Sequence, residues 1–363
     1  MNIVDARNDL LTYKHIFISI AAMQVKSDME TGDLVTALKA AAEPTRLRIL
    51  LLLQAGELNV KDLTLILGQS QPRISRHLKL LSEAGLIERF REGSWVYFHI
   101  SDRSPGGRLA LRLVAGIPAS DQTARRDRER AESLKRDRET AAQSFFEAHA
   151  ADWDRIRSLH VAEADVEAAM REALGPGPFK FLLDLGTGTG RTLELFADRY
   201  GRGLGIDVNQ AMLTYARARL AQSGRTTAQV RHGDIYALSI ADGTADAIVM
   251  HQVLHFLSDP ALAISEAARV LAPGGRLLIV DFAPHVLEFL RETEAHERLG
   301  FSGPQVNQWL SEAGLKALGA RDLRPLPSEG DGKLTVSIWI AERGENKKPG
   351  TAKRAAPSLQ EAD

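Results

Sequence analysis

An apolar run that ends in three alternating glycines constrains this chain more than any other feature of its sequence. Residues 179–185 have the length and apolar content of a buried strand, and glycines follow at positions 186, 188 and 190. Because glycine tolerates positive φ and has no side chain, the backbone can turn tightly there and approach a ligand closely. A helix is expected next, from Arg191 to Tyr200. This sequence predicts an α/β sheet with a ligand site at the carboxyl end of the strand.

Strands and helical segments alternate through the rest of this half of the chain, which is typical of an α/β sheet. We expect the domain to span residues 142–342. The tail at 343–363 is rich in Lys, Pro, Gly, Ala and Glu without an apolar period, so we expect it to be disordered. The candidate strands are Phe179–Leu185, Gly203–Asp207, Ala228–His232, Ala245–Met250, Gly275–Asp281 and Leu334–Ala341.

Acidic residues follow two of these strands at positions suited to a nucleoside. Asp207 ends its strand 17 residues after Gly190, and a carboxylate there can accept hydrogen bonds from both ribose hydroxyls. Asp234 is placed to accept from an adenine amino group, with Ile235 against the ring. The spacing therefore predicts a ligand that contains adenosine.

These segments resemble the motifs of class I S-adenosylmethionine (SAM)-dependent methyltransferases over roughly residues 142–341. The match continues through segments 246–260 and 271–281. An NAD-binding sheet is the alternative, but its G-x-G-x-x-G motif has the third glycine one residue later. The resemblance implies a Rossmann-like sheet that binds SAM or its product S-adenosylhomocysteine (SAH). The implied ligand-binding residues are Asp184, Gly186, Gly188, Gly190, Asp207, Asp234, Ile235 and His251.

Two further features bear on this ligand. In this methyltransferase family, a helix at the position of the aromatic segment 145–154 often covers the cofactor. The alternative is that this segment packs against the edge of the sheet. Methyl transfer needs mostly positioning, and a general base helps when the acceptor is weak. His251 ends a strand on the ligand side of the sheet and is the candidate catalytic base. A structural role competes with this one for His251, as it does for the other candidates, His255, His285 and His296.

The first part of the chain has a different pattern, with short helices followed by a hairpin. Helices are expected at 33–42, 45–53, 60–67, 71–84 and 107–115. The apolar residues Ile74, Leu78 and Leu81 share one helix face. Two strand-like segments, 86–91 and 95–100, flank Glu92-Gly93-Ser94, which indicates a β-hairpin. We expect this domain at residues 32–118, after an extension at 1–31.

These residues resemble the ArsR/SmtB family of winged helix-turn-helix repressors. Segments 43–50, 56–58, 70–78 and 91–98 carry the resemblance, which implies a DNA-binding homodimer paired through its first and last helices. Gln and Arg can contact base edges in the major groove, while Ser and Lys can hold phosphates. A solvated helix face is the competing interpretation. The candidate DNA-binding residues are Gln71, Arg73, Ser75, Arg76, Lys79, Arg89 and Arg91.

Composition limits the other functions. Lys and Arg (46) nearly cancel Asp and Glu (47), so any DNA binding must come from a local patch. The chain has no cysteine, which excludes disulfides, a thiolate metal sensor and arsenite methylation by thiols. Asn59 and Lys61 stand where family sensors have a Cys-x-Cys pair, and we expect no metal site. No apolar run approaches the ~20 residues of a membrane span, so we expect no membrane partner and a cytoplasmic location.

A charged segment at 119–141 joins the two halves and is expected to be a solvated helix held by ion pairs four residues apart. The combination resembles ArsR-type regulators fused to a methyltransferase domain. That resemblance implies a transcriptional regulator of double-stranded DNA operators that responds to SAM or SAH, with methionine and SAM-cycle genes as targets. The alternative is an active small-molecule methyltransferase that carries a DNA-binding module.

Overall fold

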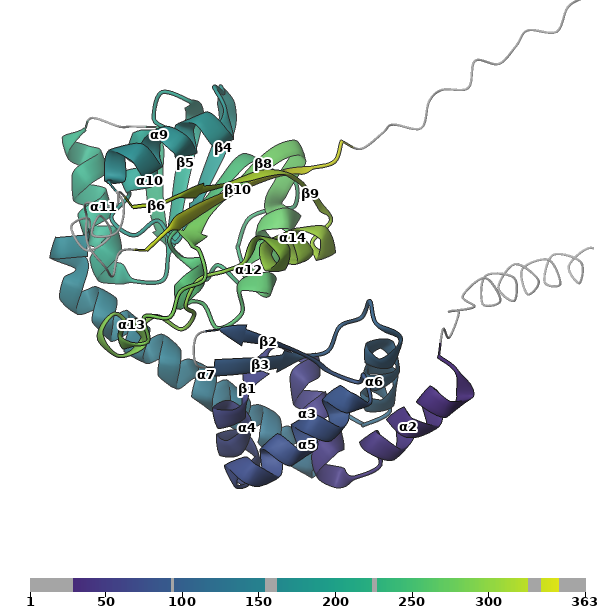
Figure 1. Ribbon diagram of the computed structural model, residues 1–363. Coiled ribbons are helices and arrows are strands. Elements are labelled where there is room, and N and C mark those ends of the chain that lie inside the picture. The colour runs from purple at the N-terminus through teal and green to yellow at the C-terminus, as the bar shows by residue number, and fades with distance from the viewer. Residues whose placement is uncertain (1–28, 93–94, 154–161, 224–226, 326–333, 346–363) are drawn as a thin grey trace, which may run out of the picture. The chain divides into compact units, whose positions relative to one another are not determined.

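A computed structural model describes residues 29–92, 95–153, 162–223, 227–325 and 334–345 (Figure 1). Most of the expected extension at 1–31 and tail at 343–363 lies outside these residues. The chain divides into two compact units. The first comprises Met1–Phe90 with Val96–Ala131, and the second comprises Arg91–Trp95 with Glu132–Asp363. The boundaries at 118 and 141 inferred from sequence remain predictions.

The first unit is a small helical domain with a three-stranded sheet. Its strands are β1 (Leu58–Asn59), β2 (Glu88–Glu92) and β3 (Trp95–His99), in the order β1-β3-β2. Leu50, Leu63 and Leu78, from three different helices, are buried in its core. Its helices are α2 (Thr31–Ala41), α3 (Pro44–Gln54), α4 (Val60–Leu67), α5 (Gln71–Glu83) and α6 (Pro105–Ala115).

Local signals explain where these helices begin and end. Glu43 precedes α3, and its side chain accepts a hydrogen bond from the Arg46 backbone N–H at 2.9 Å. Asn59 caps α4 in the same way through the Asp62 N–H at 3.0 Å. Gly68 ends α4 in the left-handed region, with φ at +64°. Helix α5 follows as the second helix of a helix-turn-helix.

The charged segment forms helix α7 (Gln122–His149), which is longer than the expected helix within 119–141. Its residues through Ala131 belong to the first unit and those from Glu132 to the second. The aromatic segment expected to form a separate lid helix is the end of α7, followed by the short helix η1 (Ala150–Asp152). The linker and the lid segment are therefore parts of one helix.

The second unit contains a seven-stranded sheet in the order β6-β5-β4-β7-β8-β10-β9. All neighbouring strands from β6 to β8 are parallel, whereas β10 is antiparallel to both β8 and β9. A dinucleotide-binding sheet has six parallel strands without this inserted strand, so the NAD alternative does not fit. The strands are β4 (Phe179–Leu185), β5 (Tyr200–Asp207), β6 (Ala228–His232), β7 (Ala245–His251), β8 (Leu271–Phe282), β9 (Leu315–Leu323) and β10 (Val336–Arg343).

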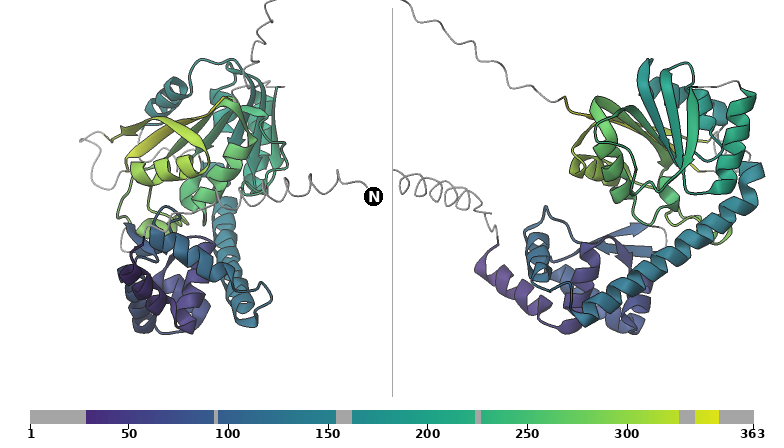
Figure 2. Two further views of the ribbon diagram at one scale, coloured as in Figure 1. Left: turned by 90° about the vertical axis from the view of Figure 1, so that its right-hand side faces the viewer. Right: turned by 180° about the vertical axis from the view of Figure 1, so that it is seen from behind.

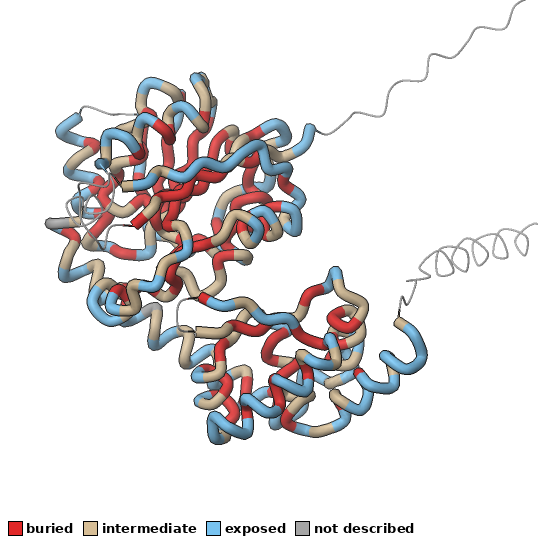
Figure 3. The backbone as a smooth tube through the Cα atoms, viewed as in Figure 1, coloured by how far each residue is buried: buried red, intermediate tan, exposed pale blue. Residues whose placement is uncertain are grey.

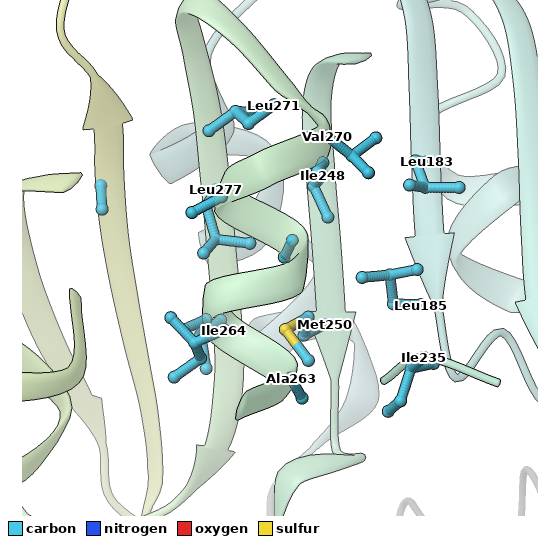
Figure 4. Close-up of a cluster of buried hydrophobic side chains, with 14 of the residues drawn as sticks. Leu183, Leu185, Ile235, Ile248, Met250, Ala263, Ile264, Val270, Leu271 and Leu277 are labelled. Atoms are coloured by element: carbon cyan, nitrogen blue, oxygen red, sulfur yellow. The ribbon is translucent and has the colours of Figure 1, made fainter. Parts of the chain in front are cut away.

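Helices cover both faces of this sheet (Figure 2). One face packs against α12 (Pro260–Val270) and α14 (Gly303–Glu312), through residues such as Ile264 and Leu310. The other face packs against α9 (Glu163–Leu174), α10 (Arg191–Leu195) and α11 (Gln210–Gln222). The central strands β4, β7 and β8 are buried along most of their length (Figure 3). Figure 4 shows how Ile248, Met250 and Leu277 meet α12.

Two expected boundaries were wrong, and one strand was missed. Helix α10 ends at Leu195, because Tyr200 already begins β5 and its hydroxyl donates to the Leu193 carbonyl at 2.7 Å. The strand expected from Leu334 begins at Val336. Strand β9 was not expected at all, because it lies at the sheet edge with most of its residues exposed and so lacks an apolar period. Within the described residues, no helix is long and apolar enough to span a bilayer.

Candidate ligand cavity and DNA-facing helix

The glycine turn between β4 and α10 depends on backbone geometry that other residues rarely adopt. Gly186, Gly188 and Gly190 all have positive φ, at +71°, +51° and +81°. A Cβ at Gly186 would lie 2.4 Å from the Val253 Cγ2, so a larger residue would collide with its neighbour. The Asp184 carboxylate accepts a hydrogen bond from the Thr187 hydroxyl at 2.6 Å, which ties the end of β4 to the turn.

Asp207 ends β5 beside this turn, and its carboxylate is held by main-chain donors. The Gly188 N–H donates to Oδ2 and the Asn209 N–H donates to Oδ1, each at 2.8 Å. Burial raises the pKa of Asp207, while these backbone hydrogen bonds lower it in part. The carboxylate is thus fixed in orientation and still has lone pairs to accept from two ligand hydroxyls.

A cavity of about 410 Å³ opens at this edge of the sheet. Its volume is within the range of small-molecule sites, ~300–1,000 Å³. Six of the eight ligand-binding residues predicted from the sequence line it. They are Gly186, Gly188, Asp207, Asp234, Ile235 and His251. Asp184 and Gly190 are outside the lining. Asp184 supports the turn, and Gly190 packs against Ala216, whose Cβ would lie 3.2 Å from an added side chain.

Helix α7 supplies a wall of the cavity, and the sequence had pointed to its aromatic end at Phe146 but not to the polar residues before it. Arg136, Thr140, Gln143 and Phe146 line the cavity. The Gln143 side-chain oxygen accepts from Asn209 Nδ2 at 3.0 Å. This stretch was interpreted as a solvated charged helix because its polar residues carry no apolar period. The structure therefore adds polar side chains to the cavity wall.

Aromatic rings form another part of the wall. Phe146 contacts the Trp153 and Phe256 rings edge-to-face, with centroids 5.2 and 4.6 Å apart. Val208 is exposed and also lines the cavity, directly after Asp207. Val208 and Ile235 thus add two apolar side chains to the cavity lining beside Asp207. The sequence had predicted that the segment containing Phe146 and Trp153 covers the cofactor, but no sequence signal identified Val208.

The histidines proposed for catalysis occupy two different environments. His251 ends β7 and lines the cavity. His255 is buried, and its Nδ1 lies 2.7 Å from Asp281 Oδ1, so it forms part of the fold beneath the cavity wall. The ring of His296 packs against His255 at 4.3 Å. Of these three histidines, His251 is the one that lines the cavity.

The recognition helix carries its polar candidates on its exposed side. Gln71, Arg73, Ser75, Arg76 and Lys79 on α5 are all exposed, and so are Arg89 and Arg91 on β2. Ile74, Leu78 and Leu81 are buried on the opposite side. His77 is buried 3.6 Å from Glu43, and burial with nearby arginines lowers its pKa. Lys79 lies 3.7 Å from Glu83, an exposed pair that DNA phosphates can replace. Among the described residues, no group of acidic or histidine side chains has the geometry of a metal site.

Each half of the chain matches a known protein family. Residues 43–89 match the bacterial regulatory protein, arsR family, and residues 183–279 match the methyltransferase domain family. The chain joins an ArsR-type segment to a methyltransferase domain. The fold class expected from the sequence is confirmed, and so is SAM or SAH as the cofactor class of this domain.

Individual relatives resemble one half or the other. The arsenical resistance operon repressor of Escherichia coli is 52% identical over 68 residues, which are 18% of this chain and 58% of the repressor. A probable S-adenosylmethionine-dependent methyltransferase of Mycolicibacterium smegmatis is 33% identical over 157 residues, 39% of this chain and 59% of that protein. The chain thus spans less than two thirds of these relatives. A Haloferax volcanii methyltransferase solved with its Trm112 activator overlays with TM-score 0.47 at 21% identity, covering 55% of this chain and 98% of that one.

Proposed function

We propose that this protein is an ArsR-type transcriptional regulator whose methyltransferase domain senses SAM or SAH. In this proposal a homodimer acts in the cytoplasm on two-fold-symmetric operators, and the target genes belong to the methionine and SAM cycle. The residues that read DNA are those exposed on α5 and β2, and the ligand occupies the cavity beside Asp207. The E. coli relative, named as an operon repressor, supports the DNA-binding half.

Helix α7 is the observation that carries the proposal. In the first unit, Asp127 is buried and receives two hydrogen bonds from Arg48 on α3, at 2.6 and 2.7 Å. Arg130 adds a hydrogen bond to the Ile66 carbonyl at 3.0 Å. In the second unit, Thr140, Gln143 and Phe146 of the same helix line the ligand cavity. A ligand that contacts α7 therefore acts on an element anchored among the DNA-binding helices.

The expected regulation follows from linkage. A ligand lowers DNA affinity only if it binds the DNA-incompetent state more tightly, and by the same factor DNA must lower the affinity for the ligand. We expect SAH or SAM to bias α7 toward that state. Asp127→Asn should then leave ligand affinity intact and weaken the effect of ligand on DNA, because it loosens the anchor at Arg48.

DNA selection followed by ligand titration tests this function. DNA bound by the purified protein is selected from a random pool, and fluorescence anisotropy then measures its affinity with no ligand, with SAM and with SAH. We expect a specific inverted repeat whose affinity falls with one of the two ligands. Selection of no specific sequence would refute the regulator, and an affinity that both saturating ligands leave unchanged would refute the sensor.

An active small-molecule methyltransferase is the second candidate, and the position of His251 in the cavity wall favours it. A histidine there can accept a proton from a weak nucleophile as the methyl group is transferred. Incubation of the protein with methyl-labelled SAM and a small-molecule extract tests this activity. Labelled product that disappears in His251→Ala at saturating SAM would support catalysis, and the absence of any labelled product from the wild type would contradict it.

A further inference from the structure

A buried carboxylate lies at the end of strand β2, within the second unit. The Glu92 side chain is only 5% exposed. The Leu299 backbone N–H donates to its Oε1 at 2.7 Å, and Arg291 Nη2 donates to the same oxygen at 2.8 Å. Arg298 Nη1 lies 3.7 Å from Oε2. We call Glu92, Trp95, Arg291, Arg298 and Leu299 the Glu92 cluster. All five residues belong to the second unit.

Arg291 is held by both strands of the hairpin. Its guanidinium carbon lies 4.0 Å from the centroid of the Trp95 ring, at the start of β3, while Glu92 ends β2. Glu288 adds a further carboxylate 3.3 Å from Arg291 Nε. A planar guanidinium can pair with a carboxylate and stack on an aromatic ring at the same time, which an ammonium does less well.

Burial distinguishes this cluster from surface ion pairs. The side chains of Arg291 and Arg298 are 9% and 2% exposed. Exposed ion pairs contribute little, but removing one partner of a buried pair leaves an uncompensated charge at high cost. The cluster therefore fixes Glu92 at the end of β2 and Trp95 at the start of β3, and breaking it should release both residues.

The alternation of the strand links this anchor to the DNA-facing arginines. Successive side chains in a strand point to opposite faces, so Glu92 shares a face with Phe90, and Arg89 shares the other with Arg91. Phe90 stacks on the Tyr97 ring at 5.5 Å, while Arg89 and Arg91 are exposed. Holding Glu92 thus orients both arginines outward. It also neutralises a carboxylate that would otherwise repel DNA phosphates.

The same cluster adjoins the ligand cavity. The backbone N–H groups of Glu297 and Arg298 both donate to the His255 carbonyl at 2.9 Å. Arg298 Nη2 lies 3.4 Å from the Ser258 carbonyl. Phe256 and Ser258, which flank this contact in sequence, line the cavity. A ligand that shifts this wall displaces the segment that carries Arg298.

We propose that Glu92 is a wing-anchoring residue that holds the hairpin in its DNA-binding conformation, and that the cavity ligand weakens DNA binding by loosening this anchor. The inference rests on the proposed sensor function and adds the route by which the cavity ligand reaches the hairpin. It assigns Arg291 and Arg298, which lie outside the DNA-binding helices, to the control of operator affinity.

Glu92→Gln in the full-length protein tests the anchor, with Glu88→Gln as the matched control. Glu88 lies on the same strand with the same charge, but it is exposed and pairs only loosely with His99 at 3.8 Å. The DNA is the fragment selected by the wild-type protein. Removing a negative charge near DNA should by itself strengthen binding. The anchor predicts the opposite sign, a loss of about tenfold or more in Glu92→Gln, since ~1.4 kcal/mol corresponds to tenfold.

Two further readouts separate the anchor from misfolding. SAH affinity without DNA should be at least that of the wild type in Glu92→Gln, because a ligand that loosens the anchor binds no less tightly once the anchor is broken. Hydrogen exchange at the Leu299 amide and along β2 should become faster. Arg291→Lys keeps the charge but loses the planar contacts, so its operator affinity should fall between those of the wild type and Glu92→Gln.

The outcomes distinguish failure of the Glu92 anchor from failure of the proposed sensor function. If the wild-type protein selects no DNA or ignores both ligands, the sensor itself is refuted. If the wild type responds to SAH and Glu92→Gln binds the operator as tightly as Glu88→Gln, the anchor is refuted. Loss of both operator affinity and SAH dependence in Glu92→Gln, with SAH binding intact, supports it.

Discussion

The exposed side of α5 and the cavity of the second unit are built from different parts of the polypeptide. On α5, exposed side chains such as Arg73 and Arg76 project from a helix whose other face is buried. In the cavity, the glycine turn and the main-chain donors to Asp207 make the binding surface. The first surface can change residue by residue without altering the fold, whereas the second changes only if the backbone changes with it.

This difference predicts how each surface responds to mutation. A side-chain surface should lose affinity in separate, moderate steps as single residues are removed. A backbone-built surface should fail abruptly when its turn is disturbed and respond less to changes at its rim. The following substitutions test this contrast, in order of decreasing effect.

Gly186→Ala should have the largest effect, because the new Cβ would meet Val253 at 2.4 Å in a residue with φ at +71°. Overpacking costs ~1–3 kcal/mol, and the left-handed conformation adds about 1–2 kcal/mol. We expect a lower melting temperature and no measurable SAH binding by calorimetry. Gly319→Ala is the control, since its Cβ would meet its nearest neighbour at 4.0 Å. Normal SAH binding in Gly186→Ala would refute the backbone-built site.

Asp207→Asn should weaken SAH binding by ~1–3 kcal/mol, because the ribose hydroxyls lose an ionised acceptor. Burial raises the pKa of Asp207, so a proton competes with the ligand as the pH falls. Wild-type affinity should therefore decline toward acidic pH, and the decline should be smaller in Asp207→Asn.

Asp198→Asn provides the control for this charge change, because Asp198 is exposed and pairs with Arg171 away from the cavity. Isothermal titration across the acidic range makes the comparison. Equal pH dependence in the wild type and Asp207→Asn would remove Asp207 from the ligand contacts.

Arg73→Ala should have an effect no larger than that of Asp207→Asn, and Lys79→Ala should have the smallest effect and differ from Arg73→Ala in kind. A base contact by Arg73 predicts a loss of ~1–3 kcal/mol with relaxed sequence preference, whereas a phosphate contact by Lys79 predicts a shallower salt dependence by about one unit. Anisotropy at several salt concentrations, on selected and scrambled DNA, separates them. Arg125→Ala, on the exposed side of α7, should match the wild type, and an unchanged Arg73→Ala would show that α5 does not read the operator.

The same contrast explains what the sequence could predict. Backbone-built features leave strong sequence signals because few residues can replace them, and Gly186, Gly188 and Asp207, which the sequence singled out, line the cavity. Five recognition-helix residues were also placed on an exposed face, because the apolar spacing of Ile74, Leu78 and Leu81 fixes which side is buried. Their contacts with DNA remain predictions.

Features that depend on tertiary context were missed. Strand β9 lies at an exposed sheet edge, where alternation is not needed for burial. Thr140 and Gln143 resemble any solvated helix residues until α7 is placed beside the turn after β5. The sequence predicts Glu92 to be a turn residue in a hairpin. Its burial depends on Arg291 and Arg298, which lie far from it in the sequence.

Reciprocal calorimetry tests most directly whether the two ligand sites are coupled. SAH is titrated into the protein alone and into its complex with the selected operator, and operator affinity is measured with and without saturating SAH. The account predicts that operator weakens SAH binding by the same factor by which SAH weakens operator binding. Tight binding of both ligands with a coupling factor of one would contradict it, and would leave a methyltransferase domain joined to an independent DNA-binding unit.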